Sequence, residues 1–299
     1  MLLATTTEDF SRFTGSHAER VLHLYEAGFR CIDLSLYKVI EGDPLFGEAW
    51  RDAAERLLAY AEGLGMRFVQ CHAPAVNCLA APERAIALTE RAIEVCGVLG
   101  IPIMVTHAGY SADADADTWR AGNLRFYRAL MPVAEACGVR VLAENSAHAN
   151  LKGYFLYSGA DMRAFADAMD HPNFGICWDT GHANMEGTQY DEILAIGDAL
   201  GAIHFHDNRG ELDEHLLPFM GTMNVDEVMH ALLDVGFRGP FTFEATHSLR
   251  PARFRQGDRR VFSADDRMTE PTLAMQKGIE RTLFTVGCEI LSAYGLREE

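Results

Sequence analysis

The sequence predicts a single-domain α/β protein, a (β/α)8 TIM barrel that uses all 299 residues. Short apolar or β-branched runs alternate with longer stretches of helical periodicity, and glycines stand at many of the boundaries between them. The cycle repeats about eight times in a length that is normal for one such barrel. Repeated strand–helix units argue for a parallel sheet, and about eight of them favour a closed barrel over an open sheet.

The predicted strands are short, and several are apolar almost throughout, as expected for parallel strands covered on both faces. No Gly-x-Gly-x-x-Gly motif follows the first of them, so a dinucleotide-binding fold has no support. In chain order the predicted strands are residues 2–6, 31–36, 67–71, 101–106, 139–143, 174–178, 202–205 and 240–243.

The segments between the strands have amphipathic helical patterns. One buried stripe is predicted from Ala85, Leu88, Ala92, Val95 and Leu99, and a second from Val225, Val228, Met229, Leu232 and Leu233. Six glycines stand just before a strand run, where a left-handed helix end is expected: Gly28, Gly65, Gly100, Gly138, Gly201 and Gly236. Residues 249–267 are rich in Arg, Asp and Gly and predict an exposed excursion, after which a helix over about 269–294 closes the barrel.

Composition restricts the partners and the compartment. The net charge of −17 opposes binding to polyanions, so we expect neither a nucleic acid nor a membrane partner. No apolar run approaches the roughly 18–20 residues needed to cross a bilayer. The N-terminus does not resemble a signal peptide, and the seven scattered cysteines form no Cys-x-x-Cys pair. These features predict a cytoplasmic protein with buried, reduced thiols.

Residue types that bind metals follow most of the predicted strands, at the end where barrels of this type carry their sites. Carboxylates and imidazoles converging there would repel or remain desolvated unless a cation held them. Mixed ligation of this kind suits Mn²⁺, Zn²⁺ or Co²⁺ better than Ca²⁺ or Mg²⁺. The candidates are His72, His107, Glu144, Asp179, His182, His204, His206, Asp213, His215 and Glu244.

The alternation of side chains along a strand leaves one ligand undecided. His204 and His206 have the same parity, so both side chains are able to point into the barrel. Asp207 has the opposite parity and is better suited to a structural role, such as orienting a ligand.

The pattern resembles the xylose-isomerase-like barrel superfamily, which contains sugar-phosphate isomerases and epimerases, ketose 3-epimerases and type IV apurinic endonucleases. The most specific stretch is His204-Phe205-His206-Asp207-Asn208, followed by Asp213-Glu214-His215-Leu216-Leu217-Pro218 and Gly221. That stretch looks like the signature of the bacterial sugar isomerase and epimerase members.

The resemblance implies a divalent metal, best matched by Mn²⁺, held by Glu144, Asp179, His204 and Glu244. It favours His204 over His206, because the family ligand precedes an Asp by three residues. It also implies that Glu144 and Glu244 are the paired catalytic acid and base, and that His182 contacts substrate hydroxyls. The expected reaction is isomerisation or epimerisation of a small sugar, sugar phosphate or polyol ketone through a metal-stabilised enediolate.

Three alternatives remain open. The endonucleases carry three zinc ions, and their additional ligands match His72, His107, His182, Asp213 and His215. Against a DNA-cleaving phosphodiesterase, the loops at 36–38 and 73–77 are not basic, and 43 acidic side chains outnumber 26 basic ones. A lyase or deglycosidase acting on oxidised sugars would use the same chemistry, and a sugar-binding protein without activity is the third alternative. Barrels of this group often pair, so a homodimer is compatible with the resemblance.

Overall fold

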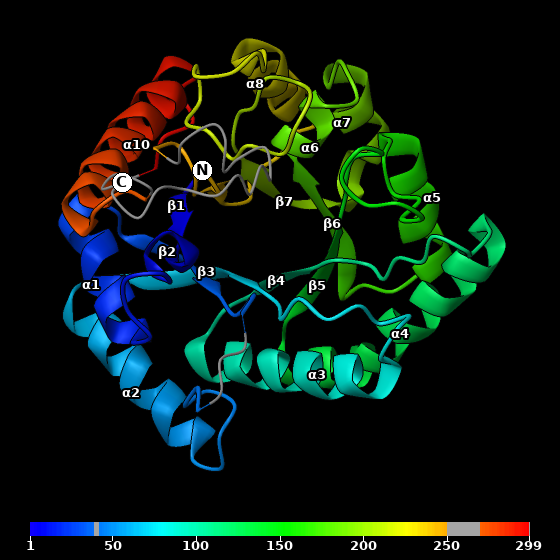
Figure 1. Ribbon diagram of the computed structural model, residues 1–299, viewed down its shortest axis with the longest axis horizontal. Helices are drawn as coiled ribbons and strands as arrows, with labels where there is room; N and C mark the ends of the chain where they lie inside the picture. The colour runs from blue at the N-terminus through cyan, green and yellow to red at the C-terminus, as the bar shows by residue number, and fades with distance from the viewer. Residues whose placement is uncertain (39–41, 250–269, 299) are drawn as a thin grey trace, which may run out of the picture.

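Eight parallel strands close into a barrel in the computed structural model, which describes residues 1–38, 42–249 and 270–298 (Figure 1). Each strand pairs with the next one in the chain, and β8 pairs with β1 to complete the circle. The predicted fold class is therefore confirmed, and each predicted strand lies within two residues of an observed one. The strands are β1 (Leu3–Thr6), β2 (Cys31–Ser35), β3 (Arg67–His72), β4 (Ile103–Thr106), β5 (Arg140–Glu144), β6 (Phe174–Asp179), β7 (Leu200–Phe205) and β8 (Phe241–Phe243).

Helices form a ring around the strands (Figure 1). The predicted stripes face the core: Ala85, Ala92, Val95 and Leu99 are buried on α3, with Leu88 half-buried beside them. The helices are η1 (Thr7–Phe10), α1 (His17–Ala27), α2 (Trp50–Gly63), α3 (Pro82–Leu99), α4 (Ala116–Cys137), α5 (Gly159–Met169), α6 (Thr180–Asn184), α7 (Tyr190–Ile196), η2 (Gly197–Ala199), α8 (Val225–Asp234) and α10 (Leu273–Ala293).

Five of the six predicted glycine helix ends have the left-handed backbone: Gly28, Gly65, Gly100, Gly138 and Gly236. The prediction for Gly201 is wrong, because Gly201 lies inside β7, which directly follows the short helix η2. A Cβ atom at Gly201 would lie 2.9 Å from Leu142 of β5. Gly201 therefore provides space between strands rather than a turn.

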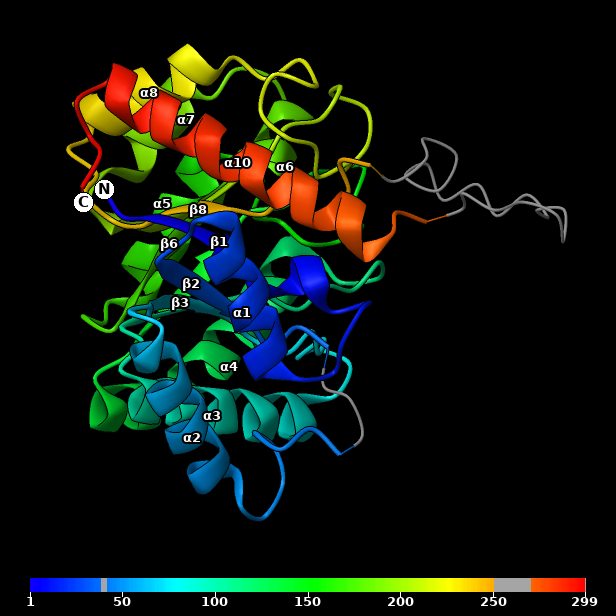
Figure 2. The ribbon, with the colours of Figure 1, turned by 90° about the vertical axis from the view of Figure 1, so that its left-hand side faces the viewer.

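The closing helix begins later than predicted, at Leu273, where the Thr272 side chain accepts a hydrogen bond from the backbone of Met275. It packs against α1, with the rings of Phe29 and Phe284 5.2 Å apart (Figure 2). The predicted excursion over 249–267, apart from Leu249, lies outside the described residues.

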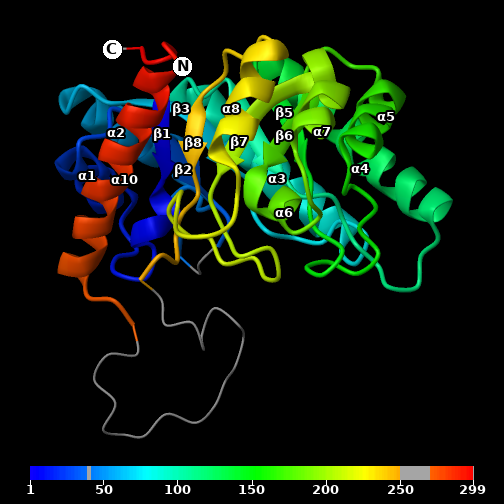
Figure 3. The same cartoon turned by 90° about the horizontal axis from the view of Figure 1, so that it is seen from above.

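Both chain ends lie at the amino-terminal end of the barrel, where the Met1 amino group donates to the Leu296 carbonyl (Figure 3). The loops that follow the strands lie at the opposite end. All seven cysteines are free thiols, and six of them are buried, as predicted. Among the helices of the described residues, none is long and apolar enough to cross a membrane.

Two carboxyl groups face each other between η1 and α10. Asp9 and Glu280 are 1% and 0% exposed, and among the described residues their only neutral hydrogen-bond donors are Thr5 and Gln276. Burial raises the pKa of Glu280 to about 7, and burial together with the Glu280 charge raises the pKa of Asp9. The pair is therefore stable when at least one of its members is protonated.

We expect this pair to weaken the fold as the pH rises. A carboxyl whose pKa is raised by folding contributes stability below its unfolded pKa, and that stability is lost as the pH passes its folded pKa. The urea midpoint of the wild-type protein should therefore fall between about pH 5 and pH 8. Glu280→Gln should flatten that slope and be the more stable protein at pH 8. Equal slopes for the two proteins would contradict the assignment.

Candidate metal centre

The barrel interior changes from apolar to charged along the strands. Near the base, Leu142, Cys177 and Ala202 belong to an inner apolar cluster. Because side chains alternate along a strand, the next inward positions are two residues further on: Glu144, Asp179 and His204. These three side chains are at most 1% exposed. The alternation along the strands therefore places these three ionisable side chains directly above the inner apolar cluster.

The four predicted metal ligands come together. Ligand atoms of Glu144, Asp179, His204 and Glu244 all lie within 4.8 Å of one another. Nδ1 of His204 lies 2.9 Å from Oε1 of Glu144 and 3.6 Å from Oε2 of Glu244. The two glutamates, one at the end of β5 and one just after β8, thus approach the same ring nitrogen from different sides of the barrel.

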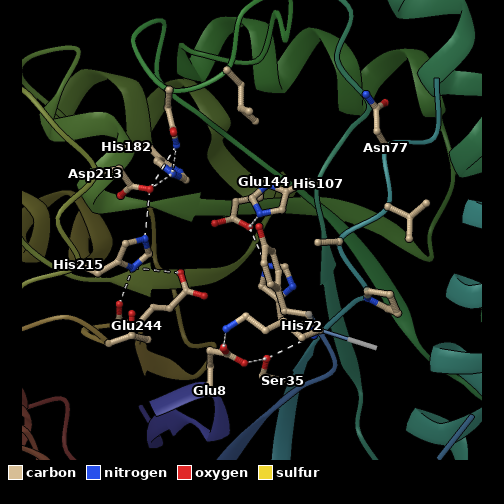
Figure 4. Close-up of a pocket in the computed structure, with 18 of the residues that line it drawn as sticks. Glu8, Ser35, His72, Asn77, His107, Glu144, His182, Asp213, His215 and Glu244 are labelled. Atoms are coloured by element: carbon tan, nitrogen blue, oxygen red, sulfur yellow. Dashed lines mark hydrogen bonds and ion pairs between the residues drawn. The ribbon is translucent and has the colours of Figure 1, made fainter. Parts of the chain in front are cut away.

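A second group shares Glu144. His72 ends β3, His107 follows β4, and Nε2 of each lies 3.5 Å from Oε2 of Glu144 (Figure 4). That oxygen is buried and has no hydrogen-bond partner among the described residues. One oxygen of Glu144 therefore faces the four-residue group and the other faces these two imidazoles.

A third group lies on the other side of Asp179. Oδ2 of Asp213 lies 3.2 Å from Nε2 of His182 and 3.2 Å from Nε2 of His215 (Figure 4). His206 stacks on His215 with ring centroids 4.0 Å apart, and its Nε2 lies 3.0 Å from Oδ2 of Asp179. His206 thus joins this group, while His204 belongs to the four-residue group.

The loop after β7 is folded back to bring Asp213 and His215 over the barrel. Asp207 and Leu216 form an antiparallel bridge through two backbone hydrogen bonds of 2.9 and 2.8 Å. The Asp207 carboxylate also accepts from the backbone of Asn208, Gly221 and Met223. Asp207 therefore has a structural role, as its parity suggested: it holds the loop that carries two of the candidate ligands.

The turn after β6 places two more groups. Asp179 caps the short helix α6 by accepting from the backbone of His182, 2.7 Å away. Gly181 supplies the space for His206, because a Cβ atom there would lie 1.9 Å from Cε1 of that ring. In the sequence Asp179-Thr180-Gly181-His182, the first and last residues are thus candidate ligands. The glycine leaves space for a third candidate, His206.

Backbone carbonyls select one tautomer for three of the histidines. Nδ1 of His72, His182 and His215 lies 2.9, 3.0 and 2.7 Å from a carbonyl oxygen. A carbonyl only accepts, so Nδ1 carries the hydrogen and Nε2 is left with its lone pair when the ring is neutral. In each case Nε2 is the nitrogen that comes nearer to a carboxylate, at 3.5 Å for His72 and 3.2 Å for His182 and His215, which is the arrangement that metal ligation requires.

The charges of the cluster are mutually dependent. Burial raises the pKa of Glu144, but His204, His107 and His72 outweigh it and hold that pKa well below the ordinary value. Burial likewise raises the pKa of Asp213, and His215 and His182 lower it further than burial raises it. Burial lowers the pKa of His215, but Asp213 raises it to about 10. Protons on the imidazoles therefore compensate the carboxylates, which a divalent cation would also do.

These residues fit a divalent metal. Each buried group offers oxygen or imidazole nitrogen ligands, and three rings hold Nδ1 against a carbonyl and present Nε2. Among the described residues, no hydrogen-bond donor reaches Oε2 of Glu144 or Oδ1 of Asp213. The four-residue group is the largest set in mutual reach among the described residues. It is the best candidate for a principal metal.

The cluster forms the floor of an open cavity of about 580 Å³. Its apolar sides come from Tyr37, Val76 and Leu151, and its polar rim includes Asn77 and Asn150. Four further aromatic residues do not line it: Phe155, Tyr157, Trp178 and Phe219. Trp178 belongs to β6 and is buried, Phe219 is 67% exposed, and Phe155 and Tyr157 line a separate hollow.

Sequence reasoning missed two contributors. Asn150 donates to both His182 and Asp213, but it lies in an irregular loop with no motif around it. Tyr37 packs edge-on against His72 at 5.1 Å, and only its place just after β2 hinted at a role.

Comparison with known proteins agrees with this architecture. Residues 21–262 match the family described as xylose isomerase-like TIM barrel. The chain belongs to this family. A probable endonuclease 4 of Methanoculleus marisnigri is 30% identical over 221 residues, covering 66% of this chain and 74% of that protein. An L-ribulose 3-epimerase of Methylomonas sp. is 30% identical over 161 residues, covering 52% of this chain and 50% of that protein.

An uncharacterized protein of Sinorhizobium fredii, y4fM, is 31% identical over 173 residues, covering 54% of this family member and 53% of that protein. The match thus spans about half the length of several curated relatives. Solved structures agree over nearly the whole barrel. A D-psicose 3-epimerase with D-tagatose from Clostridium cellulolyticum superposes with a TM-score of 0.77 at 17% identity, covering 97% of this chain and 99% of that one.

We expect Gly181→Ala to disturb the metal centre. The added methyl group must displace the His206 ring or the α6 turn, so Zn²⁺ affinity and the melting temperature in the presence of Zn²⁺ should both fall. Gly278→Ala on α10 is the matched control, because a Cβ atom there meets nothing within 4 Å. Isothermal titration and thermal unfolding measure both effects. A Gly181→Ala protein that binds Zn²⁺ like the wild type would contradict the packing argument.

Proposed function

We propose that this barrel is a divalent-metal-dependent isomerase or epimerase of a small sugar or polyol ketone. The observation that carries the proposal is the approach of Glu144 and Glu244 to one ring nitrogen of His204 at the floor of an open cavity. Two carboxylates on different sides of a bound substrate carbon are what stereochemical inversion by proton transfer needs. The names of the similar solved structures, several of them ketose 3-epimerases, support the same chemistry.

Glu144, Asp179, His204 and Glu244 would hold the metal. When bound, a divalent ion stabilises the negative charge that develops on substrate oxygens as a neighbouring C–H bond loses its proton. Mn²⁺ is the best match to this mixed ligand set, and Zn²⁺ and Co²⁺ also suit it.

The protein's own groups supply the remaining steps. Glu144, almost fully buried and held as a carboxylate by the imidazoles around it, removes a proton from the substrate carbon on its side. Glu244, partly exposed to the cavity, enters the step protonated and gives that proton to the same carbon from its own side, so that the configuration inverts and the removed proton stays on Glu144. In the reverse reaction the two exchange roles. Return of the proton to the adjacent carbon instead would isomerise the sugar, with the same residues.

Other residues would orient the substrate and limit water. His182 and Asn150 present polar atoms at the cavity wall, where they would contact substrate hydroxyls. Tyr37, Val76 and Leu151 form apolar sides that would pack on the carbon skeleton and exclude solvent from the reacting carbon. A ligand of sugar size is smaller than the cavity of about 580 Å³.

A second candidate function follows from the two additional ligand groups. His72 and His107 with Glu144, and Asp213 with His215 and His206, each form a set that offers three ligand atoms in mutual reach. Three metals so placed would suit hydrolysis of a phosphoester, and the related probable endonuclease 4 makes abasic DNA the natural substrate to test. The net charge of −17 opposes binding to DNA, so the sugar reaction is the better supported of the two candidate functions.

We expect Glu144→Gln and Glu244→Gln to fold but to lose turnover by about 10²- to 10⁴-fold, because each removes a proton-transfer group. The assay is a panel of ketoses and their phosphates in deuterated water with Mn²⁺, in which NMR follows both the product and solvent deuterium at the inverted carbon. Glu186→Gln is the matched control, since Glu186 pairs with His148 outside the cavity. Wild-type turnover by either site variant would remove that residue from the mechanism.

Metal content should separate the two candidate functions. For a sugar enzyme, chelator-treated protein should recover activity with about one Mn²⁺ or Co²⁺ per chain, and Asp213→Asn should keep that metal. Elemental analysis and the ketose assay measure this. Cleavage of an abasic-site duplex at moderate salt, with about three metals per chain and loss of cleavage in Asp213→Asn, would instead establish the phosphodiesterase. Activity indifferent to chelator would overturn both.

A further inference from the structure

Gln70 of β3 lies inside the barrel below the candidate ligands and takes no part in the steps proposed above. Its amide nitrogen is 2.9 Å from Nε2 of His204, and its amide oxygen is 3.4 Å from the hydroxyl of Thr242. All three residues are 0% exposed. The thiol of Cys177 also contacts the His204 ring, but a thiol is a weaker partner than an amide. Gln70 is thus the strong neutral partner of the ring nitrogen that faces away from Glu144.

His204 differs from three of the other candidate histidines in how its tautomer is selected. His72, His182 and His215 place Nδ1 against backbone carbonyls, which only accept and so leave one neutral tautomer. His204 is turned the other way: Nδ1 faces the carboxylates of Glu144 and Glu244. Its outer nitrogen, Nε2, meets a side-chain amide, which has a donor at one end and an acceptor at the other.

The two ends of the amide suit two different states of His204. With the amide nitrogen toward the ring, Gln70 donates to Nε2, and Nδ1–H of His204 donates to Glu144. A metal on Nδ1 requires the hydrogen on Nε2 instead, and Nε2–H then needs an acceptor. Half a turn of the amide supplies its oxygen at the same place, and the amide nitrogen then donates to the Thr242 hydroxyl, which accepts as readily as it donates.

We propose that Gln70 is the positioning residue for His204, and that its amide oxygen accepts from Nε2–H when a metal binds Nδ1. This inference rests on the metal centre of the proposed function. A glutamine suits this position, because its amide is able either to donate or to accept a hydrogen bond. A carboxylate at this position only accepts, an apolar side chain does neither, and a backbone carbonyl is unable to turn. Thr242 keeps the amide hydrogen-bonded in both orientations, so neither one leaves a buried polar end without a partner.

Binding of Zn²⁺ alone tests the proposal, without any substrate. Gln70→Met has nearly the same shape but no polar end, and it should weaken Zn²⁺ binding by about 10- to 100-fold in chelator competition, the usual effect of removing such a partner. Gln70→Glu restores an acceptor and should recover most of the affinity. Gln276→Met is the matched control, a buried glutamine on α10 that donates to Glu280, and its Zn²⁺ affinity should equal that of the wild type.

A double-mutant cycle assigns the loss to His204. Gln70→Met should weaken Zn²⁺ no further in a His204→Ala background, because the partner it positions is gone. The histidine ring NMR signals of the zinc-loaded wild type should include an Nε2–H proton of His204 protected from exchange, and Gln70→Met should lose that protection. If Gln70 had only a structural role, the double-mutant cycle would show no coupling with His204, and the Nε2–H proton would stay protected in Gln70→Met.

The outcomes are separable. Wild-type protein that binds Zn²⁺ while Gln70→Met binds it equally tightly overturns this inference and leaves the proposed function standing. Wild-type protein that fails to bind Zn²⁺, Mn²⁺ or Co²⁺ overturns the metal centre and this inference together. Circular dichroism checks that each variant is folded before its affinity is compared.

Discussion

The buried charge of Glu144 is the interaction on which the rest of the site depends. Its carboxylate is 1% exposed, so burial alone would favour the neutral form strongly. Contacts with His204 on one oxygen and with His72 and His107 on the other oppose that penalty. The group is stable as an anion only where several imidazoles, or a metal in place of their protons, surround it. Two of the candidate ligand groups share this carboxylate.

The scaffold meets that requirement with backbone geometry more than with flexible side chains. Strand alternation lifts Glu144, Asp179 and His204 one step above an apolar floor. Carbonyls set the tautomers of three rings, Asp207 ties down the loop that carries Asp213 and His215, and Gly181 leaves space for His206. Each of these contacts restricts the conformation of candidate ligands before an ion binds, so ion binding does not need to order their side chains. Gln70 is the exception, because its contact with His204 admits two arrangements.

Sugar epimerisation and phosphoester hydrolysis make overlapping demands on such a cluster. Both use a cation to stabilise developing negative charge on oxygen. They differ in what must surround it: two proton-transfer groups on either side of a carbon, or additional metals around a phosphate. This chain has candidates for both, since Glu144 belongs to two ligand groups at once. The apolar sides that Tyr37, Val76 and Leu151 give the cavity and the net charge of −17 favour a small neutral substrate over a polyanion.

The sequence by itself determined the barrel, the ends of all eight strands to within two residues, and the residue types that meet above it. It did so because hydrophobic period and glycine helix ends are local signals, and because parallel strands in a barrel must all end on one face. The four-residue ligand group was likewise expected from a resemblance and was brought together by the fold. Its role remains a proposal.

Only the tertiary structure decided which of His204 and His206 faces which carboxylate. The two share one parity, and the choice depends on Gly181 and His215, which are distant from β7 or lie on a folded-back loop. The cavity walls were likewise decided by the tertiary structure, since loop conformation is set by long-range contacts such as the bridge between Asp207 and Leu216. The contact between Gln70 and His204 was equally impossible to predict from the sequence. Gln70 is 134 positions away in the chain, and no spacing rule connects the two until the barrel closes.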